Sequence, residues 1–238
     1  MVYFVKKTLD LKALLTSCNI ANICFILATA LMITFTGIVW KQDFFRILPL
    51  YISLIVGMGQ SYASRYASLV GGINCILYTI VYISFGLYAQ AANALLISCP
   101  LQIATFIRWS KHKYKNSTEF RKLSPKGRLI AATIFGICFV TVYFILIAVN
   151  SSYQLLDTGL TLIAIFTSVL TLFSFIEYSW LMLGTGLLSI ALDIAMIPDH
   201  PAQITYLIFS IYSLICISRQ FFAVRNLYKE QIKIRKDK

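Results

Sequence analysis

The chain has 238 residues, of which 59% are hydrophobic and 13% are charged, and its mean hydropathy is +0.78. An average soluble domain has about 25% charged residues. A soluble core of this size would leave much of the apolar surface in contact with water. The composition therefore excludes an ordinary soluble domain and favours a protein that lies in a bilayer.

Eight segments are long and apolar enough to cross the membrane, for which a helix needs roughly 20 mostly apolar residues. They are 18–40, 47–63, 66–88, 90–109, 129–149, 155–175, 178–196 and 202–222. The first follows basic residues, as a signal peptide would, but it is too long for a signal sequence and is read as a spanning helix. We predict an all-α polytopic membrane protein with about eight transmembrane helices. Seven spans with one interfacial segment is the alternative, because the second segment is short and the next two are hardly separated.

The net charge of +12 is concentrated at the ends of apolar runs. Three lysines lie in the N-terminal arm (Lys6, Lys7, Lys12), eight Lys/Arg lie between Arg108 and Arg128, and seven lie between Arg219 and Lys238. Such flanking charges are typical of residues that fix membrane orientation, so we expect no nucleic-acid partner. Four spans separate the two large basic segments, which places both segments and both chain ends in the cytoplasm.

The basic linker itself contains the stretch 121–128, which reads as a solvated loop because Pro and Gly interrupt it. Anchoring of the topology is the simpler interpretation of its charge, and binding of anionic membrane lipid is the alternative. Glu177, at a short corner on the same side, is expected to be solvated.

Two parts of the chain, 47–109 and 155–222, each contain three spans. Because four segments separate equivalent helices, the two triplets have the same orientation and form a parallel repeat, as in some transporters. The predicted divisions are an N-terminal arm with an extra helix (1–46), a first repeat (47–109), a basic loop with a linker helix (110–154), a second repeat (155–222) and a basic cytoplasmic tail (223–238).

Motifs for catalysis or metal binding do not occur in the sequence. It has neither GxxxxGK[ST] nor HExxH, and His112 and His200 are isolated. The six cysteines form no CxxC pair. We therefore expect no enzymatic activity, no metal and no cofactor. A membrane-embedded enzyme and an accessory subunit without a ligand stay open as alternatives.

Polar side chains within the spans are candidates for a binding site, because polar groups are costly in lipid unless they face a cavity or a partner. Asn74 and Gln102 lie deepest, and their amides offer both donors and acceptors. Tyr78 and Tyr82 follow Asn74 at helical spacing on one face, which suits stacking on a planar heterocycle. Further polar positions lie nearer the span ends: Gln60, Asp157, Thr161 and Asp193. For the two aspartates, solvation at the membrane interface is the alternative.

A series of short motifs resembles the PnuC-type vitamin transporters over roughly residues 60–225. In order, they are Arg65, Gly72, Asn74, Leu77-Tyr78, Leu87-Tyr88-Ala89, Gln102-Ile103, Arg108-Trp109, Leu156-Asp157-Thr158, Glu177 and Trp180. The family's Trp-x-x-Trp-x-x-Asn signature corresponds here to Trp180, Leu183 and Gly186, so two of its three positions differ. This departure puts the family's substrate in doubt more than its fold.

The resemblance implies a three-plus-one-plus-three bundle similar to the SWEET sugar transporters. It further implies uptake of nicotinamide riboside, or of another vitamin such as thiamine or riboflavin, by facilitated diffusion. A cytoplasmic kinase would trap the product, and the location would be a bacterial cytoplasmic membrane. Oligomerisation of the chain with itself is left open. The residues expected at the substrate are first Asn74, Gln102 and Trp180, and then Tyr78, Tyr82, Asp157 and Thr161.

Overall fold

The computed structural model describes residues 20–151 and 153–236. The N-terminal lysines and Cys18 lie outside the described residues. Within this part, eight helical stretches are long and apolar enough to cross a membrane, which confirms the predicted number of spans. The helices are α3 (Ile20–Val39), α4 (Phe44–Ser61), α5 (Arg65–Ser84), the continuous rod of α6 (Tyr88–Ala92), π-helix η1 (Asn93–Ser98) and α7 (Cys99–Lys111), then α8 (Pro125–Ala148), α9 (Gln154–Leu172), α10 (Tyr178–Met196), and η2 (Pro201–Gln203) with α11 (Ile204–Lys236).

Three helix ends differ from the predicted spans by four residues or more. The third span ends four residues early because Gly86 has a φ of 68° and terminates α5. The stretch 121–128 is only partly a loop, since Pro125 begins α8 and the Ser124 hydroxyl accepts a hydrogen bond from the amide of Gly127. Proline fits the first turn of a helix, where its missing N–H has no intrahelical partner. Finally, the basic tail continues α11 as a helix to Lys236.

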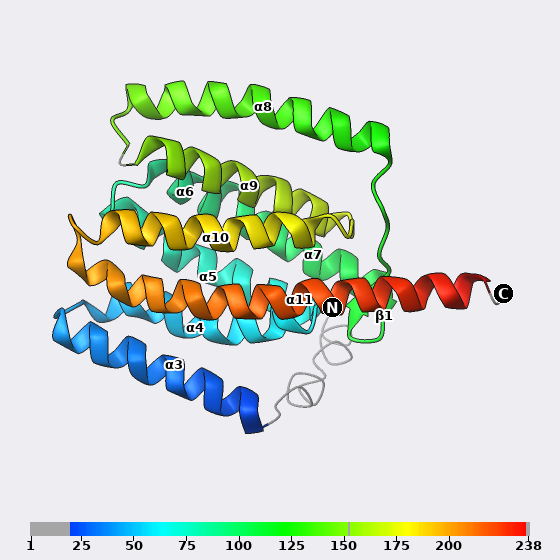
Figure 1. Ribbon diagram of the computed structural model, residues 1–238, viewed down its shortest axis with the longest axis horizontal. Coiled ribbons are helices and arrows are strands. Elements are labelled where there is room, and N and C mark those ends of the chain that lie inside the picture. Colours follow the sequence, from blue (N-terminus) through cyan, green and yellow to red (C-terminus); the bar gives the residue numbers. More distant parts are fainter. Residues whose placement is uncertain (1–19, 152, 237–238) are drawn as a thin grey trace, which may run out of the picture.

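Six helices form a closed ring (Figure 1). Around it, α4 contacts α5, α5 contacts α7, α7 contacts α9, α9 contacts α10, α10 contacts α11, and α11 returns to α4. The first helix of each triplet therefore packs on the last helix of the other triplet. The equivalent helices of the two triplets also run in the same direction (Figure 1). This arrangement is the predicted parallel repeat, and it leaves a space inside the ring that both halves line.

Two of the described helices lie outside the ring. The N-terminal α3 packs against α4 and α11, and the linker helix α8 packs against α9, standing at one edge of the molecule (Figure 1). Of the 24 residues of α8, the structure buries only Leu146. An apolar helix with so little protein contact is suited to lipid on its remaining faces.

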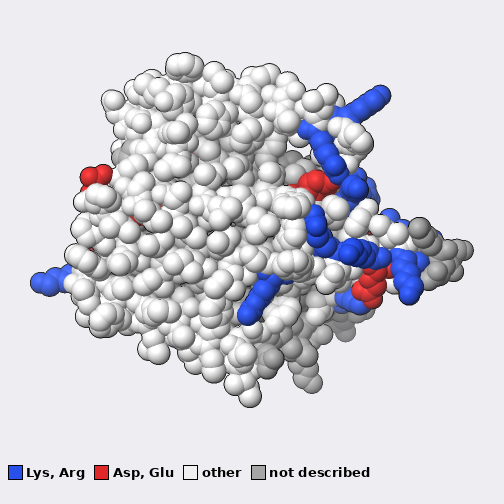
Figure 2. Space-filling model, viewed as in Figure 1, with Lys and Arg blue, Asp and Glu red and all other residues white. Residues whose placement is uncertain are grey.

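Basic residues gather at one end of the molecule, the end from which α11 projects; we call it the basic end (Figure 2). Here the linker between the halves forms a small hairpin of β1 (Lys113–Tyr114) and β2 (Ser117–Thr118). The Gln231 side chain, on the α11 extension, accepts a hydrogen bond from the amide of Phe120 at 2.9 Å and donates one to the carbonyl of Thr118 at 3.0 Å. The predicted solvated linker is thus partly ordered against the helix bundle.

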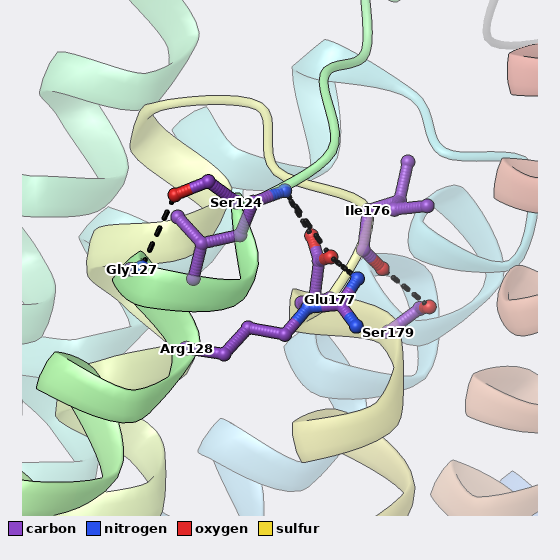
Figure 3. A network of polar contacts seen from close by, with 7 residues as sticks. Ser124, Gly127, Arg128, Ile176, Glu177 and Ser179 are labelled. Atoms are coloured by element: carbon purple, nitrogen blue, oxygen red, sulfur yellow. Dashed lines mark hydrogen bonds and ion pairs between the residues drawn. The ribbon is translucent and has the colours of Figure 1, made fainter.

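The sequence suggested that Glu177 is simply solvated, but its carboxylate has hydrogen-bond partners in the protein. Its carboxylate accepts hydrogen bonds from the backbone amide of Leu123 at 3.2 Å and from Arg128 Nη2 at 2.8 Å. Figure 3 shows this network, in which the carboxylate lies between the first turn of α8 and the start of α10. The contact fixes where the linker helix begins relative to the second triplet.

Candidate functional site

The described residues line two cavities inside the ring of helices. The larger cavity, of about 260 Å³, lies toward the end opposite the basic end and is lined by residues of α4, α5, α9, α10 and α11 together with Gln90 of α6 and Gln102 of α7. The smaller cavity, of about 210 Å³, lies toward the basic end, where Trp109 and Tyr178 contribute to its lining. Gln60 and Gln102 line both cavities, so the two cavities are adjacent to each other between the two triplets.

Asn74 lines the larger cavity and is held in a defined orientation. Its side chain is 3% exposed, and its Nδ2 donates to the Pro49 carbonyl at 3.0 Å and to Ser53 Oγ at 2.7 Å. Ser53 in turn donates to Tyr78 Oη at 3.0 Å. The Asn74 Oδ1 atom is buried and makes no hydrogen bond in the structure. A buried acceptor without a partner costs free energy, which a ligand donor would recover.

Tyr78 and Tyr82 also line the larger cavity. Their ring centroids lie 5.5 Å apart with 24° between the planes. They follow Asn74 along the same face of α5, as the sequence spacing predicted. The cavity therefore has an amide next to a pair of stacked aromatic rings.

Gln102 lies where the two cavities meet. Its Nε2 donates to Cys75 Sγ at 3.3 Å, and its Oε1 is buried without a hydrogen bond in the structure. Gly71 makes room for this side chain, because a Cβ atom at Gly71 would lie 2.2 Å from Gln102 Oε1. A glycine on α5 thus permits an amide from α7 to reach the space between the halves.

Asp193 lines the larger cavity, although it is not among the residues expected at the substrate. It is 6% exposed. Gln203 Nε2 donates to its Oδ1 at 2.6 Å, and the Ser210 hydroxyl donates to its Oδ2. Its position near the end of a span suggested interfacial solvation. The signal that was available is the acidic residue itself, since a carboxylate within a span is costly unless it faces a cavity or a partner.

Three other predicted site residues do not line either cavity. Trp180 is 56% exposed and packs on Phe221, at 4.6 Å between ring centroids, and on the Arg225 guanidinium. The Asp157 carboxylate is fully buried and accepts hydrogen bonds from the backbone amides at the start of α6. Thr161 is 5% exposed, inside α9. The structure therefore brings Asn74, Gln102, Tyr78 and Tyr82 together and separates these three from them.

These features define the class of protein. A chain with eight spanning helices, built as two like-oriented triplets around polar cavities, has the architecture of a multi-pass membrane transporter.

The comparisons with known proteins then identify the family. A sequence model described as "Nicotinamide mononucleotide transporter" matches residues 44–222. The chain therefore belongs to the nicotinamide mononucleotide transporter family, and it is a transporter rather than an enzyme. The predicted resemblance is confirmed.

The fold is also similar to a solved structure, described as "Crystal structure of the Vitamin B3 transporter PnuC". The TM-score is 0.76, the sequence identity is 16%, and the match covers 90% of this chain and 94% of that chain. At this identity the likeness establishes the fold but not the substrate. No curated protein matches the chain.

Proposed function

We propose that the protein takes up nicotinamide riboside, or a closely related vitamin nucleoside, through the space between its two triplets. The observation on which this proposal rests is the larger cavity, in which the Asn74 and Gln102 amides lie beside the Tyr78–Tyr82 pair. Amides match the hydroxyl and carboxamide groups of such a nucleoside, and the stacked rings match its planar base.

The size and polarity of the cavity support a small ligand of this kind. Amide and hydroxyl groups surround it on several sides, and it also has aromatic walls, which is typical of small-molecule sites. Two further amides, of Gln90 and Gln203, have buried atoms without hydrogen bonds in the structure. A ribosyl group offers several hydroxyls that satisfy such atoms.

The charges of the cavity favour the nucleoside over the nucleotide. No Lys or Arg is among the described residues that line the larger cavity, whereas the Asp193 carboxylate is. Phosphate groups are ordinarily held by Arg, Lys or helix N-termini, and a carboxylate repels them. We therefore propose that the transported form lacks the phosphate that the family's name mentions.

Transport is proposed to be facilitated diffusion, with the two triplets rocking about the central site to give alternating access. A cytoplasmic kinase that phosphorylates the product would make uptake one-way. We place the protein in the bacterial cytoplasmic membrane, with both termini and the basic end in the cytoplasm, because basic residues favour that side.

Uptake measurements test this proposal. The chain is expressed in a bacterial strain that lacks its own nicotinamide riboside uptake and has a kinase for it. Labelled nicotinamide riboside is then expected to accumulate as the phosphorylated product. In the same strain without the kinase, the label should only equilibrate with the medium. Concentration of free label above the medium would contradict facilitated diffusion.

A vitamin panel separates the substrate alternatives. Thiamine and riboflavin are supplied as unlabelled competitors in the same assay. Nicotinamide riboside is expected to compete best. Uptake no greater than that of the empty vector for every compound would contradict the transport proposal as a whole.

A further inference from the structure

Asp193 is an unusual group in the larger cavity, because it is buried and none of the described residues forms an ion pair with it. It is 6% exposed, and its two hydrogen-bond donors, Gln203 and Ser210, are both neutral. Among the described residues, the ion pairs are Lys115–Glu230, Arg128–Glu177 and Arg235–Glu119, and none of them involves Asp193. A carboxylate removed from water is strongly stabilised by a cation that arrives next to it.

The neutral donors hold the carboxylate in place without cancelling its charge. One donor comes from the turn before α11 and the other from α11 itself, and each occupies a different carboxylate oxygen. The group is thus oriented before any ligand arrives. Such preorganisation lowers the cost of binding.

Aromatic rings line the same cavity as this carboxylate. They are Tyr78, Tyr82, Phe85, Tyr206 and Phe209. Phe85 packs edge-to-face on Tyr206 with 5.5 Å between centroids and 90° between planes, which fixes both rings. Aromatic faces attract cations, and several of them around one site recognise quaternary nitrogen.

One of these rings already attracts a cation of the protein. The Arg46 guanidinium carbon lies 5.2 Å from the ring centroid of Phe85. Arg46 itself does not line the larger cavity, and among the described residues it forms no ion pair with Asp193. The carboxylate therefore stays available to a ligand.

From this combination we infer that Asp193 and the surrounding aromatic rings form a subsite for a delocalised organic cation, such as a pyridinium or thiazolium ring. The inference rests on the proposed function and deepens it, since the subsite selects the charge of the ligand. The amides of Asn74 and Gln102 contact the polar part of the ligand, while the subsite distinguishes a cationic ring from a neutral ring of the same shape.

The test compares a cation with its neutral counterpart. Binding to the detergent-purified protein is measured for nicotinamide riboside and for its reduced dihydro form, which has nearly the same shape but no charge on the ring. The small pair 1-methylnicotinamide and its dihydro form is measured in parallel. We expect each cation to bind at least about tenfold more tightly than its neutral counterpart.

Variants assign the preference to Asp193. Asp193→Asn should reduce the ratio of affinities to within about threefold, and Asp193→Glu should restore part of it. The matched control is Asp199→Asn, which removes a carboxylate that is bonded to Tyr153 and does not line the larger cavity. This control should leave the ratio unchanged. The comparison of ligands on the unmodified protein stays informative even where Asp193→Asn does not fold.

The outcomes separate the subsite from the transport proposal. Asp193-dependent binding of 1-methylnicotinamide, in a protein that does not take up nicotinamide riboside, would support the subsite and contradict the proposed substrate. Uptake of nicotinamide riboside with equal affinity for its charged and neutral forms would overturn the subsite and leave transport intact. Absence of measurable 1-methylnicotinamide binding would also overturn the subsite.

Discussion

Arg128 Nη2 lies 2.8 Å from Glu177 Oε1, so an ion pair joins the first turn of α8 to the start of α10 (Figure 3). The Arg128 side chain is 48% exposed and that of Glu177 is 17% exposed. The same carboxylate also accepts the amide of Leu123. This relationship connects the linker helix to the second triplet at the basic end of the molecule.

Because the pair is partly exposed, the coupling of Arg128 to Glu177 should be about 0.5–1 kcal/mol. Thermal unfolding of the purified protein is measured for Arg128→Gln, Glu177→Gln and the double variant. We expect Glu177→Gln to lower the midpoint more than Arg128→Gln, since it also weakens the bond to Leu123. Full additivity of the two single effects would contradict the ion pair.

Gln102→Ala should decrease uptake of nicotinamide riboside roughly tenfold or more at low substrate, because a lost hydrogen bond in a closed site costs about 1–3 kcal/mol. Asn74→Ala should have an effect of the same order. Trp180→Ala is the matched comparison, because Trp180 lies outside both cavities. Uptake is normalised to the amount of protein in the membrane. A larger loss for Trp180→Ala than for Gln102→Ala would favour the residue predicted from the family signature over the cavity.

Gly71→Ala should act through Gln102. The added methyl group would lie 2.2 Å from Gln102 Oε1, so the flexible end of Gln102 has to move. We expect reduced uptake with little change in thermal stability. In a Gln102→Ala background the same substitution should have no further effect on uptake. Gly184→Ala is the control, since a Cβ atom there meets nothing within 4 Å. Additive effects of Gly71→Ala and Gln102→Ala would contradict this coupling.

Asp157→Ala should affect stability rather than substrate affinity. The carboxylate accepts the backbone amides of Ala89 at 3.3 Å and Gln90 at 3.2 Å, and is fully buried. Removing it leaves two amide groups without this acceptor, at a cost of about 2 kcal/mol or more. The thermal midpoint should fall, and Asp157→Asn, which keeps one oxygen, should lower it less. The KM of the protein that remains folded should stay near its original value, and a large rise in KM would instead place Asp157 at the substrate.

A hydrogen bond from the Tyr153 hydroxyl to Asp199 raises the pKa of Tyr153 from 10 to about 12. Since the folded-state pKa is raised, the stabilisation is fully present below pH 10 and disappears as the pH rises through about 12. Asp199→Asn should bring the pKa of Tyr153 back toward 10. The difference in tyrosinate absorbance between the two proteins during a titration measures this change. Identical titrations would show that the bond does not form in solution.

Several parts of the fold follow from the sequence alone. Hydropathy predicts all eight candidate spans. The thickness of the bilayer sets the length that a spanning helix needs, and local composition shows which segments are apolar over that length. The even number of spans between basic segments also predicts the like orientation of the two triplets. Helix ends were less predictable, because Gly86 and Pro125 act through backbone geometry rather than hydropathy.

The sequence also indicated part of the candidate site. Asn74 and Gln102 lie deep within apolar helices, and a polar group at that depth has to face protein rather than lipid. The positions of Asp157 and Asp193 were harder to predict, since both residues lie near span ends and could be solvated there. Asp157 turns to the backbone of α6, whereas Asp193 turns into the larger cavity.

Which face of each helix turns inward is decided by its neighbours in the ring. Trp180 has an amphipathic side chain that is stable at a membrane interface as well as in a cavity, so its residue type does not fix its place. The sequence determined that helices cross the membrane in two matched triplets. The packing of α10 between α9 and α11 decided that Asp193 rather than Trp180 lies in the cavity, because only packing sets the rotation of a helix about its own axis.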